Sequence, residues 1–222
     1  MLQKIKRILA ASENRQTFFA RIERYYSRYS MEYEVIECAY DDAKDAFRNV
    51  KRTGGERYFE HVRAVAIILI DYVGICELCN LQIPAHKIIV AALLHDVVED
   101  CEEWSLNRTA RRYGRSTTMI LDYVSKRPKS DFSSTREQLS HYHKKLINAP
   151  FEVILIKLAD RLHNQLTLWC CNEEKIRRKH RETVDIFLLL ARRWGILVHE
   201  LEATTEDFDN RIEKHIKQCS MT

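Results

Sequence analysis

The densest group of reactive side chains in this sequence is segment 93–100, LLHDVVED. It places one imidazole and three carboxylates within six residues, beside an apolar run. Burying that much charge without partners costs several kcal/mol per group. A bound cation would offset this cost, because adjacent His95 and Asp96 can offer one nitrogen and one oxygen to the same divalent ion. Glu99 and Asp100 follow one turn later, within reach of a water at that ion.

Two further residues could complete a metal site. His61 lies near the start of an apolar segment, where a hydrogen-bonded structural histidine is the alternative. Asp160 belongs to a polar stripe at helical spacing in an otherwise apolar segment, and this stripe is either a solvated face or the wall of a cavity. We favour the cavity, with Arg161 and Gln165 directed elsewhere. The stripe consists of Lys157, Asp160, His163, Asn164 and Thr167.

The composition predicts an all-α fold. Only 5 glycines and 3 prolines occur in 222 residues, too few for the turns of a β-rich fold, and helix-forming residues are abundant. We expect a bundle of about ten helices in a single domain, 1–222. Helices are expected near 31–50, 58–78, 85–98, 116–125, 134–147, 151–170, 173–194 and 198–217, after a helical N-terminal region. Within the domain we expect a basic helical extension (1–44), a core (45–200) and a C-terminal helix or tail (201–222).

Charge and cysteine content narrow the class of protein. The formal charge of +4 is too small to indicate a nucleic-acid binder, and the basic residues of the first thirty positions either keep that region soluble or suit an acidic partner. No apolar run reaches the length of about 18 residues that a membrane span needs. The 7 cysteines, with Cys170 next to Cys171, suggest buried reduced thiols. With no signal peptide, a cytoplasmic location is expected.

The order His, His-Asp and distant Asp resembles the ligand pattern of the HD phosphohydrolase superfamily. Longer stretches sharpen this resemblance to the hydrolase domain of Rel/SpoT-type alarmone enzymes, and in particular to stand-alone small alarmone hydrolases. These stretches are RTGGERYFEHVRAVA, AALLHDVVEDC, VILIKLADRLHNQLTL and RETVDIFLLLARRWGI. They lie within about residues 45–200, so the resemblance makes that core an HD hydrolase.

The resemblance implies a metal-dependent reaction. It assigns one Mn²⁺ ion to His61, His95, Asp96 and Asp160, and the catalytic pair to Glu99 and Asp100. Hydroxide would attack the phosphorus on the ribose 3′ oxygen of guanosine tetra- or pentaphosphate. The products would be pyrophosphate and GDP or GTP.

Substrate contacts are implied at four further positions. Arg52 matches an arginine that stacks on guanine, Asn164 and Thr167 match the nucleoside pocket, and Lys126 matches a lysine that could face a phosphate or remain a solvated charge. The chain departs from the family pattern at Val62, where a proline is usual, and at two positions where a cation is common, Thr53 and Leu166. Two alternatives therefore stay open: an HD hydrolase of another 3′-phosphorylated nucleotide, and a catalytically silent nucleotide sensor.

Overall fold

The computed structural model describes residues 2–10 and 13–219, and within these ranges it is helical, with one isolated bridge between Lys51 and Arg57 and no strand. The all-α prediction is confirmed. In chain order the α-helices are α1 (Leu2–Ala10), α2 (Arg15–Ile22), α3 (Met31–Ala46), α4 (Tyr58–Ile67), α5 (Ala85–Leu94), α6 (Val97–Asp100), α7 (Leu106–Val124), α8 (Thr135–Ile147), α9 (Phe151–Leu166), α10 (Glu173–Glu182), α11 (Leu188–Trp194) and α12 (Val198–Cys219).

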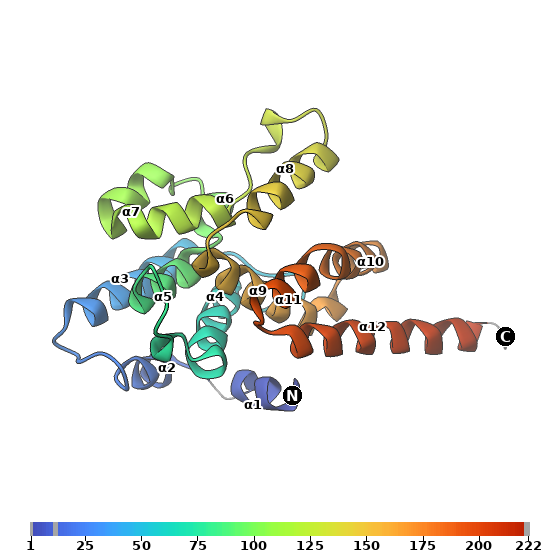
Figure 1. Ribbon diagram of the computed structural model, residues 1–222, viewed down its shortest axis with the longest axis horizontal. Helices are drawn as coiled ribbons and strands as arrows, with labels where there is room; N and C mark the ends of the chain where they lie inside the picture. Colours follow the sequence, from blue (N-terminus) through green and yellow to red (C-terminus); the bar gives the residue numbers. More distant parts are fainter. Residues whose placement is uncertain (1, 11–12, 220–222) are drawn as a thin grey trace.

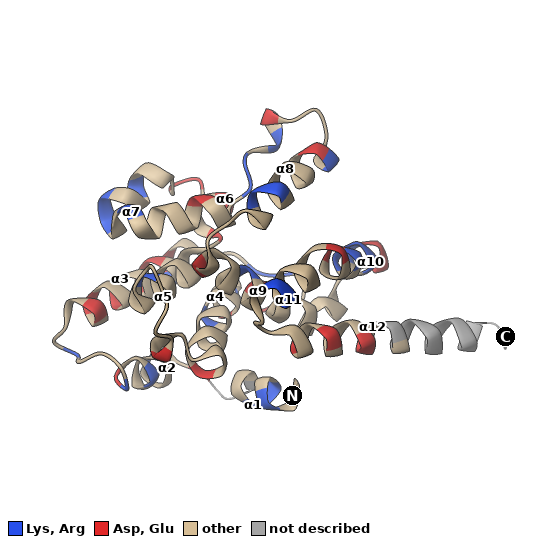
Figure 2. Ribbon diagram, viewed as in Figure 1, with Lys and Arg blue, Asp and Glu red and all other residues tan. Residues whose placement is uncertain are grey.

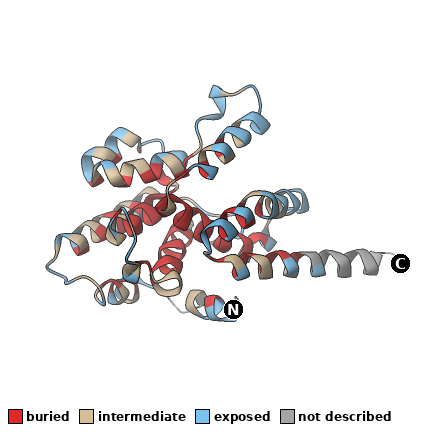
Figure 3. Cartoon of the chain, in the orientation of Figure 1, coloured by how far each residue is buried: buried red, intermediate tan, exposed pale blue. Residues whose placement is uncertain are grey.

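Helix α5 lies at the centre of the molecule (Figure 1). Every residue from Ile88 to Leu94 is buried, and the helix packs against α3, α4, α7 and α9. Helix α9 is buried along nearly its whole length and also contacts α4, α7, α11 and α12. Figure 3 shows this buried centre, with α7 and α8 forming a more exposed layer beside it. None of the described helices is long and apolar enough to cross a bilayer.

The N-terminal helices pack onto the same core. Ile5 of α1 and Phe18, Phe19 and Ile22 of α2 are buried in it. Arg21 joins α2 to the region after α4 through a 2.5 Å ion pair with Asp71. The basic character of this region is therefore partly absorbed by internal ion pairs.

Several of the expected helices end earlier than the apolar pattern indicated, among them α3 at Ala46 and α9 at Leu166. The expected helix 58–78 is α4 followed by a π-helical turn, Ile68–Val73, which ends at Gly74 in the left-handed region (φ 70°). The expected helix 85–98 ends at Leu94, and a new turn, α6, begins after Asp96. His95 and Asp96 therefore lie just past the end of α5, and Glu99 and Asp100 lie in the separate turn of α6.

Two other regions also differ from expectation. The expected helix 116–125 is the second half of α7, whose first half, from Leu106, was not predicted because its residues are mostly polar; the halves meet in a kink at Gly114 (φ 80°). The expected helix 173–194 is interrupted by a π-helical turn, Thr183–Phe187, between α10 and α11. Local bends of this kind leave little trace in hydrophobic periodicity.

Candidate active site

Three buried elements carry the four residues expected to bind metal. His61 lies in the first turns of α4, His95 and Asp96 form the joint between α5 and α6, and Asp160 lies in the second half of α9. At the joint, Asp96 leaves the helix of α5 and its carbonyl accepts the Asp100 N–H at 2.9 Å, which starts the turn of α6. The bend directs Asp96 toward α4 and α9.

The four side chains converge on one point. His61 Nε2 lies 3.2 Å from Asp160 Oδ1 and 3.7 Å from Asp96 Oδ2, while His95 Nε2 lies 3.1 Å from Asp96 Oδ2 and 3.7 Å from Asp160 Oδ1. His61, His95 and Asp96 each offer one ligand atom, and these three atoms lie within 4.8 Å of one another. Ligands at about 2.1 Å from one ion are separated by about 3.0 Å at a right angle and about 3.4 Å at a tetrahedral angle. The spacing therefore fits a shared divalent ion.

Hydrogen bonds at the far ring nitrogens orient both imidazoles. His95 Nδ1 lies 2.8 Å from the Ala92 carbonyl, to which it can only donate, and this leaves Nε2 unprotonated when the ring is neutral. His95 Nε2 is buried and has no hydrogen-bond partner among the described residues. His61 Nδ1 lies 2.8 Å from Nδ1 of buried His163. An orphaned ring nitrogen directed at two carboxylates fits a cation site.

Electrostatics support the same interpretation. Burial lowers the pKa of His95, but Asp96 and Asp160 raise it to about 10. Burial alone would raise the pKa of Asp160, but Lys157 and the two histidines hold it well below its usual range. Asp160 accepts hydrogen bonds from Lys157 Nζ at 2.6 Å and Asn164 Nδ2 at 2.5 Å. The site therefore keeps its carboxylates ionised and attracts positive charge.

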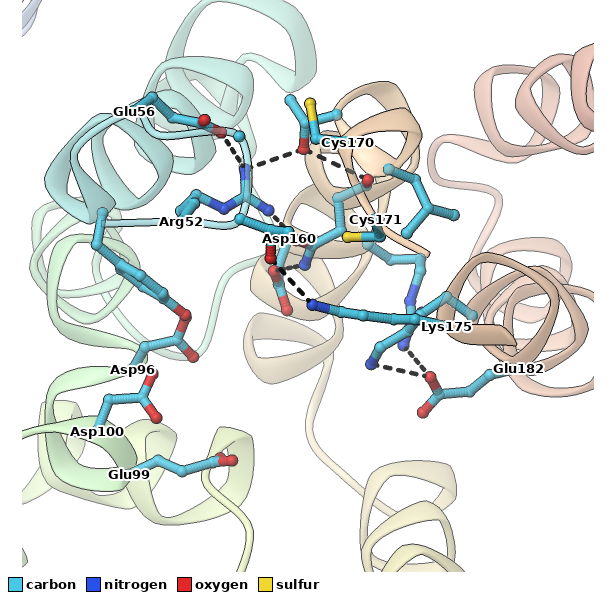
Figure 4. A pocket seen from close by; sticks show the side chains of 18 of the residues that line it. Arg52, Glu56, Asp96, Glu99, Asp100, Asp160, Cys170, Cys171, Lys175 and Glu182 are labelled. Carbon is cyan, nitrogen blue, oxygen red and sulfur yellow. Dashed lines mark hydrogen bonds and ion pairs between the residues drawn. The ribbon is translucent and has the colours of Figure 1, made fainter. Parts of the chain in front are cut away.

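The expected catalytic carboxylates border the same pocket (Figure 4). Glu99 is held by a single residue, because both Lys126 Nζ (2.8 Å) and the Lys126 backbone N–H (3.1 Å) bind its carboxylate. Burial, Asp96 and Glu99 raise the pKa of Asp100 to about 6. Asp100 is therefore mostly ionised at neutral pH and able to accept a proton there.

Arg52, Asn164 and Thr167 form the opposite wall of the pocket. Arg52 Nη2 donates to Asn164 Oδ1 at 2.6 Å and Arg52 Nη1 donates to Thr167 Oγ1 at 2.9 Å. These two bonds, with an ion pair to Glu56 at 3.5 Å, hold the guanidinium of Arg52 in place at the pocket wall. The structure therefore places all ten expected site residues at the pocket or at the metal-facing cluster beneath it.

Several pocket residues were not expected from the sequence. Tyr58, whose ring stacks on Phe47, donates to Asp96 Oδ2 at 2.7 Å. Arg161 lines the pocket, so the expectation that it points elsewhere is wrong. Other unexpected cationic residues in the lining are Lys51, Lys175 and Lys179, and Lys157 of the expected polar stripe lines it too. Only α10 brings Lys175 and Lys179 to the pocket, and no sequence motif marks that approach.

The cysteine pair also lies in the pocket wall. Cys170 is exposed and Cys171 half-buried, so the expectation of buried thiols is wrong for this pair. Cys170 ends a short 3₁₀ turn that follows α9, and Cys171 is the next residue, where the chain leaves the core.

Comparisons with known proteins agree on the type of domain. The family model described as "HD domain" matches residues 39–197. The guanosine-3′,5′-bis(diphosphate) 3′-pyrophosphohydrolase of Aquifex aeolicus (strain VF5) is 37% identical over 186 residues, which cover 82% of this chain and 25% of that protein. The bifunctional (p)ppGpp synthase/hydrolase SpoT of Escherichia coli (strain K12) is 36% identical over 175 residues, 78% of this chain and 23% of that protein.

A relative of similar identity is named for a different reaction. A GTP pyrophosphokinase of Streptomyces coelicolor is 37% identical over 164 residues, 72% of this chain and 18% of that protein. The chain thus spans about a quarter or less of the curated relatives. A solved structure titled as a metazoan ortholog of SpoT that hydrolyzes ppGpp aligns with a TM-score of 0.65, covering 80% of this chain and 96% of that chain. At 21% identity it shows the shared fold.

Proposed function

This chain belongs to the HD domain family, and from that premise we propose that it hydrolyses the 3′-pyrophosphate of guanosine tetra- and pentaphosphate. The products would be pyrophosphate and GDP or GTP. The observation that carries the proposal is the convergence of two imidazole nitrogens and two carboxylates, with His95 Nε2 buried and unpartnered among the described residues. The relatives named for this hydrolysis support the choice of substrate.

We propose that His61, His95, Asp96 and Asp160 hold one Mn²⁺ ion. Mixed imidazole and carboxylate ligands suit this metal. When bound, the ion supplies a Lewis acid beside the phosphate and makes water more acidic. Lys157 and Asn164 fix Asp160, and Tyr58 fixes Asp96, so the ligand positions are set before any ion arrives.

The carboxylates of α6 would move the proton. Asp100, with its pKa raised to about 6, is suited to remove a proton from the attacking water. Glu99 lies beside it, positioned by the side chain and backbone of Lys126. Lys126 would then have two roles. It positions Glu99, and its charged amine faces the phosphates of the substrate.

The nucleoside would occupy the Arg52 wall. Asn164 and Thr167 hold the guanidinium of Arg52 in a fixed plane, against which a purine can stack. The lysine that is common after Arg52 in the family is Thr53 here, but Lys175 Nζ of α10 approaches to 3.5 Å from Thr53 Oγ1. Lys175 therefore supplies a cation beside Thr53 from a different helix, α10. This contact favours the guanosine substrate despite the departure at Thr53.

The test is a substrate panel. Purified protein is incubated with Mn²⁺ and a set of 3′-phosphorylated nucleotides, and the products are identified by chromatography, with Asp160→Ala as a control that lacks a ligand. We expect GDP and pyrophosphate from guanosine tetraphosphate and no product from the control. Turnover of only other 3′-phosphorylated nucleotides would support the alternative function, an HD hydrolase of a different nucleotide. The observation that favours this alternative is Leu166, which stands where the family commonly has a cation.

We further propose a cytoplasmic location, because the six described cysteines are free thiols and the proposed substrate is a cytosolic class of nucleotide. An acidic partner for the N-terminal helices remains a proposal. Fractionation of cells that express the chain tests the location.

A further inference from the structure

A second cavity, of about 470 Å³, opens beside the active-site pocket. The two share four wall residues, Glu99, Lys126, Lys179 and Glu182. The remaining walls of this groove come mainly from α8 and from the segment of α10 and the π-helical turn after it. Figure 4 places Arg52 at one end of the active-site pocket and Glu99 at another, with Asp160 between them. The groove therefore begins at the proton-transfer end, away from the nucleoside wall.

The charge in this groove is not balanced. Glu182 contacts two cations and an imidazole, with Arg161 Nη2 at 2.8 Å, Lys179 Nζ at 3.2 Å and His143 Nε2 at 2.9 Å. Glu99 is neutralised by Lys126. Asp185 is the one further acid that the described part of the chain adds to the groove lining.

Two arginines of α10 supply the excess positive charge. Arg178 and Arg181 are exposed, line the groove and have no ion pair within the described part of the chain. They are three residues apart, so they lie on one face of the helix. Burial and nearby Arg161 lower the pKa of Lys179 to about 8, as expected where cations are crowded. Figure 2 shows the concentration of basic residues on α10.

The proposed reaction makes an anion at the mouth of this groove. Water attacks the phosphorus attached to the ribose 3′ oxygen, the bond from phosphorus to that oxygen breaks, and the oxygen takes up a proton to become a hydroxyl group. The phosphorus stays in the pyrophosphate, next to Glu99 and Lys126. We propose that the groove between α8 and α10 is the binding and exit site for this pyrophosphate, an inference that rests on the proposed function.

The lining chemistry selects a small polyanion. Paired guanidinium groups bind phosphate oxygens through forked, charge-assisted hydrogen bonds. Among the described residues, no tyrosine, phenylalanine or tryptophan lines the groove, so they offer no stacking surface for a nucleobase. Arg178 and Arg181 are not needed to bind metal or to move a proton, so they can be changed without removing the catalytic residues.

The experiment measures pyrophosphate binding directly. Titration calorimetry of metal-free protein with pyrophosphate avoids chelation of the ion, and product inhibition of the Mn²⁺ enzyme gives a second readout. We expect the Arg178→Gln/Arg181→Gln variant to bind pyrophosphate about 5- to 20-fold more weakly, with an equal rise in the inhibition constant. The matched control is Arg177→Gln, because Arg177 lies on the same helix, pairs with Glu173 and does not line the groove. The control should behave like the parent.

Two results would overturn the inference. One is equal pyrophosphate affinity in the parent and the double variant. The other is a raised KM for the nucleotide with unchanged pyrophosphate binding, which would assign the arginines to the 5′ phosphates of the substrate. Failure of the proposed function is distinguishable, because binding to metal-free protein requires no turnover. If no nucleotide is hydrolysed but pyrophosphate binding still depends on both arginines, the groove stands as an anion site and the hydrolysis is refuted.

Discussion

At the scale of single residues, the metal-facing histidines are oriented by the partners behind them. His163 Nδ1 contacts the far nitrogen of His61, and this contact decides which nitrogen of His61 faces the carboxylates. Burial and the neighbouring histidines and Arg52 keep the pKa of His163 well below its usual value, so His163 is neutral. Neutral His163 can accept the Nδ1 proton of His61, which leaves His61 Nε2 free to bind an ion.

His163→Leu should therefore weaken Mn²⁺ binding by about 10- to 100-fold, since the acceptor that holds His61 is lost. His163→Asn retains a polar acceptor close to the Nδ1 position and should recover most of the affinity. Calorimetric titration with Mn²⁺ measures both. Equal affinities in the Leu and Asn variants, accompanied by an equal loss of thermal stability, would show that His163 only fills space.

Asp100 should make kcat/KM of the proposed reaction fall at low pH. Its pKa is raised to about 6, so the carboxyl is protonated below that pH and cannot accept a proton. We expect kcat/KM to rise with pH toward a plateau. A bound cation lowers the pKa of a nearby carboxyl, so the bend should lie at or below about pH 6. A pH profile measures this, and Asp100→Asn should be slow and lack the bend; a profile in which the variant keeps the bend would assign it to another group.

At the scale of elements, α10 completes a pocket whose remaining walls come mainly from earlier segments, with Phe187 added from the π-helical turn after it. We expect Lys175→Gln to raise KM for the nucleotide by about three- to tenfold with little change in kcat, because Lys175 lies near Thr53 and away from the metal ligands. Steady-state kinetics on the variant and on Arg177→Gln, a neighbour paired with Glu173, isolates the effect. A loss confined to kcat would contradict a binding role.

The site could be predicted from the sequence where chemistry and spacing coincide. His95 and Asp96 are adjacent, and Asp160 and Asn164 share one face of α9, so short patterns identified them. The approach of Lys175 and Arg161 depends on how α10 and α9 pack, and Tyr58 matters only because the joint after α5 brings Asp96 to its hydroxyl. The helix boundaries failed at Gly74 and at the joint itself, where the chain bends without a change in its apolar period, and the first half of α7 was missed because its residues are mostly polar.

At the scale of the whole molecule, the N-terminal helices belong to the packed core. Removal of residues 1–30 would expose the apolar surface that Phe18, Phe19 and Ile22 cover. Each such side chain contributes about 1.5–3 kcal/mol when buried. We therefore expect the truncated chain to unfold at a markedly lower temperature or to aggregate, as measured by thermal melting. A truncated chain with the melting temperature of the parent would show that this region is a separable extension.

The proposed metal ligands lie on both sides of a connection that a protease can cut. His61, His95 and Asp96 precede the exposed connection between α7 and α8, and Asp160 follows it. A single tryptic cut after exposed Lys129 would leave donors on both fragments, with α5 and α9 still packed together. We expect the nicked halves to co-elute in size-exclusion chromatography with Mn²⁺ and to part in denaturant. The ion would then be a reversible, non-covalent link between the two fragments.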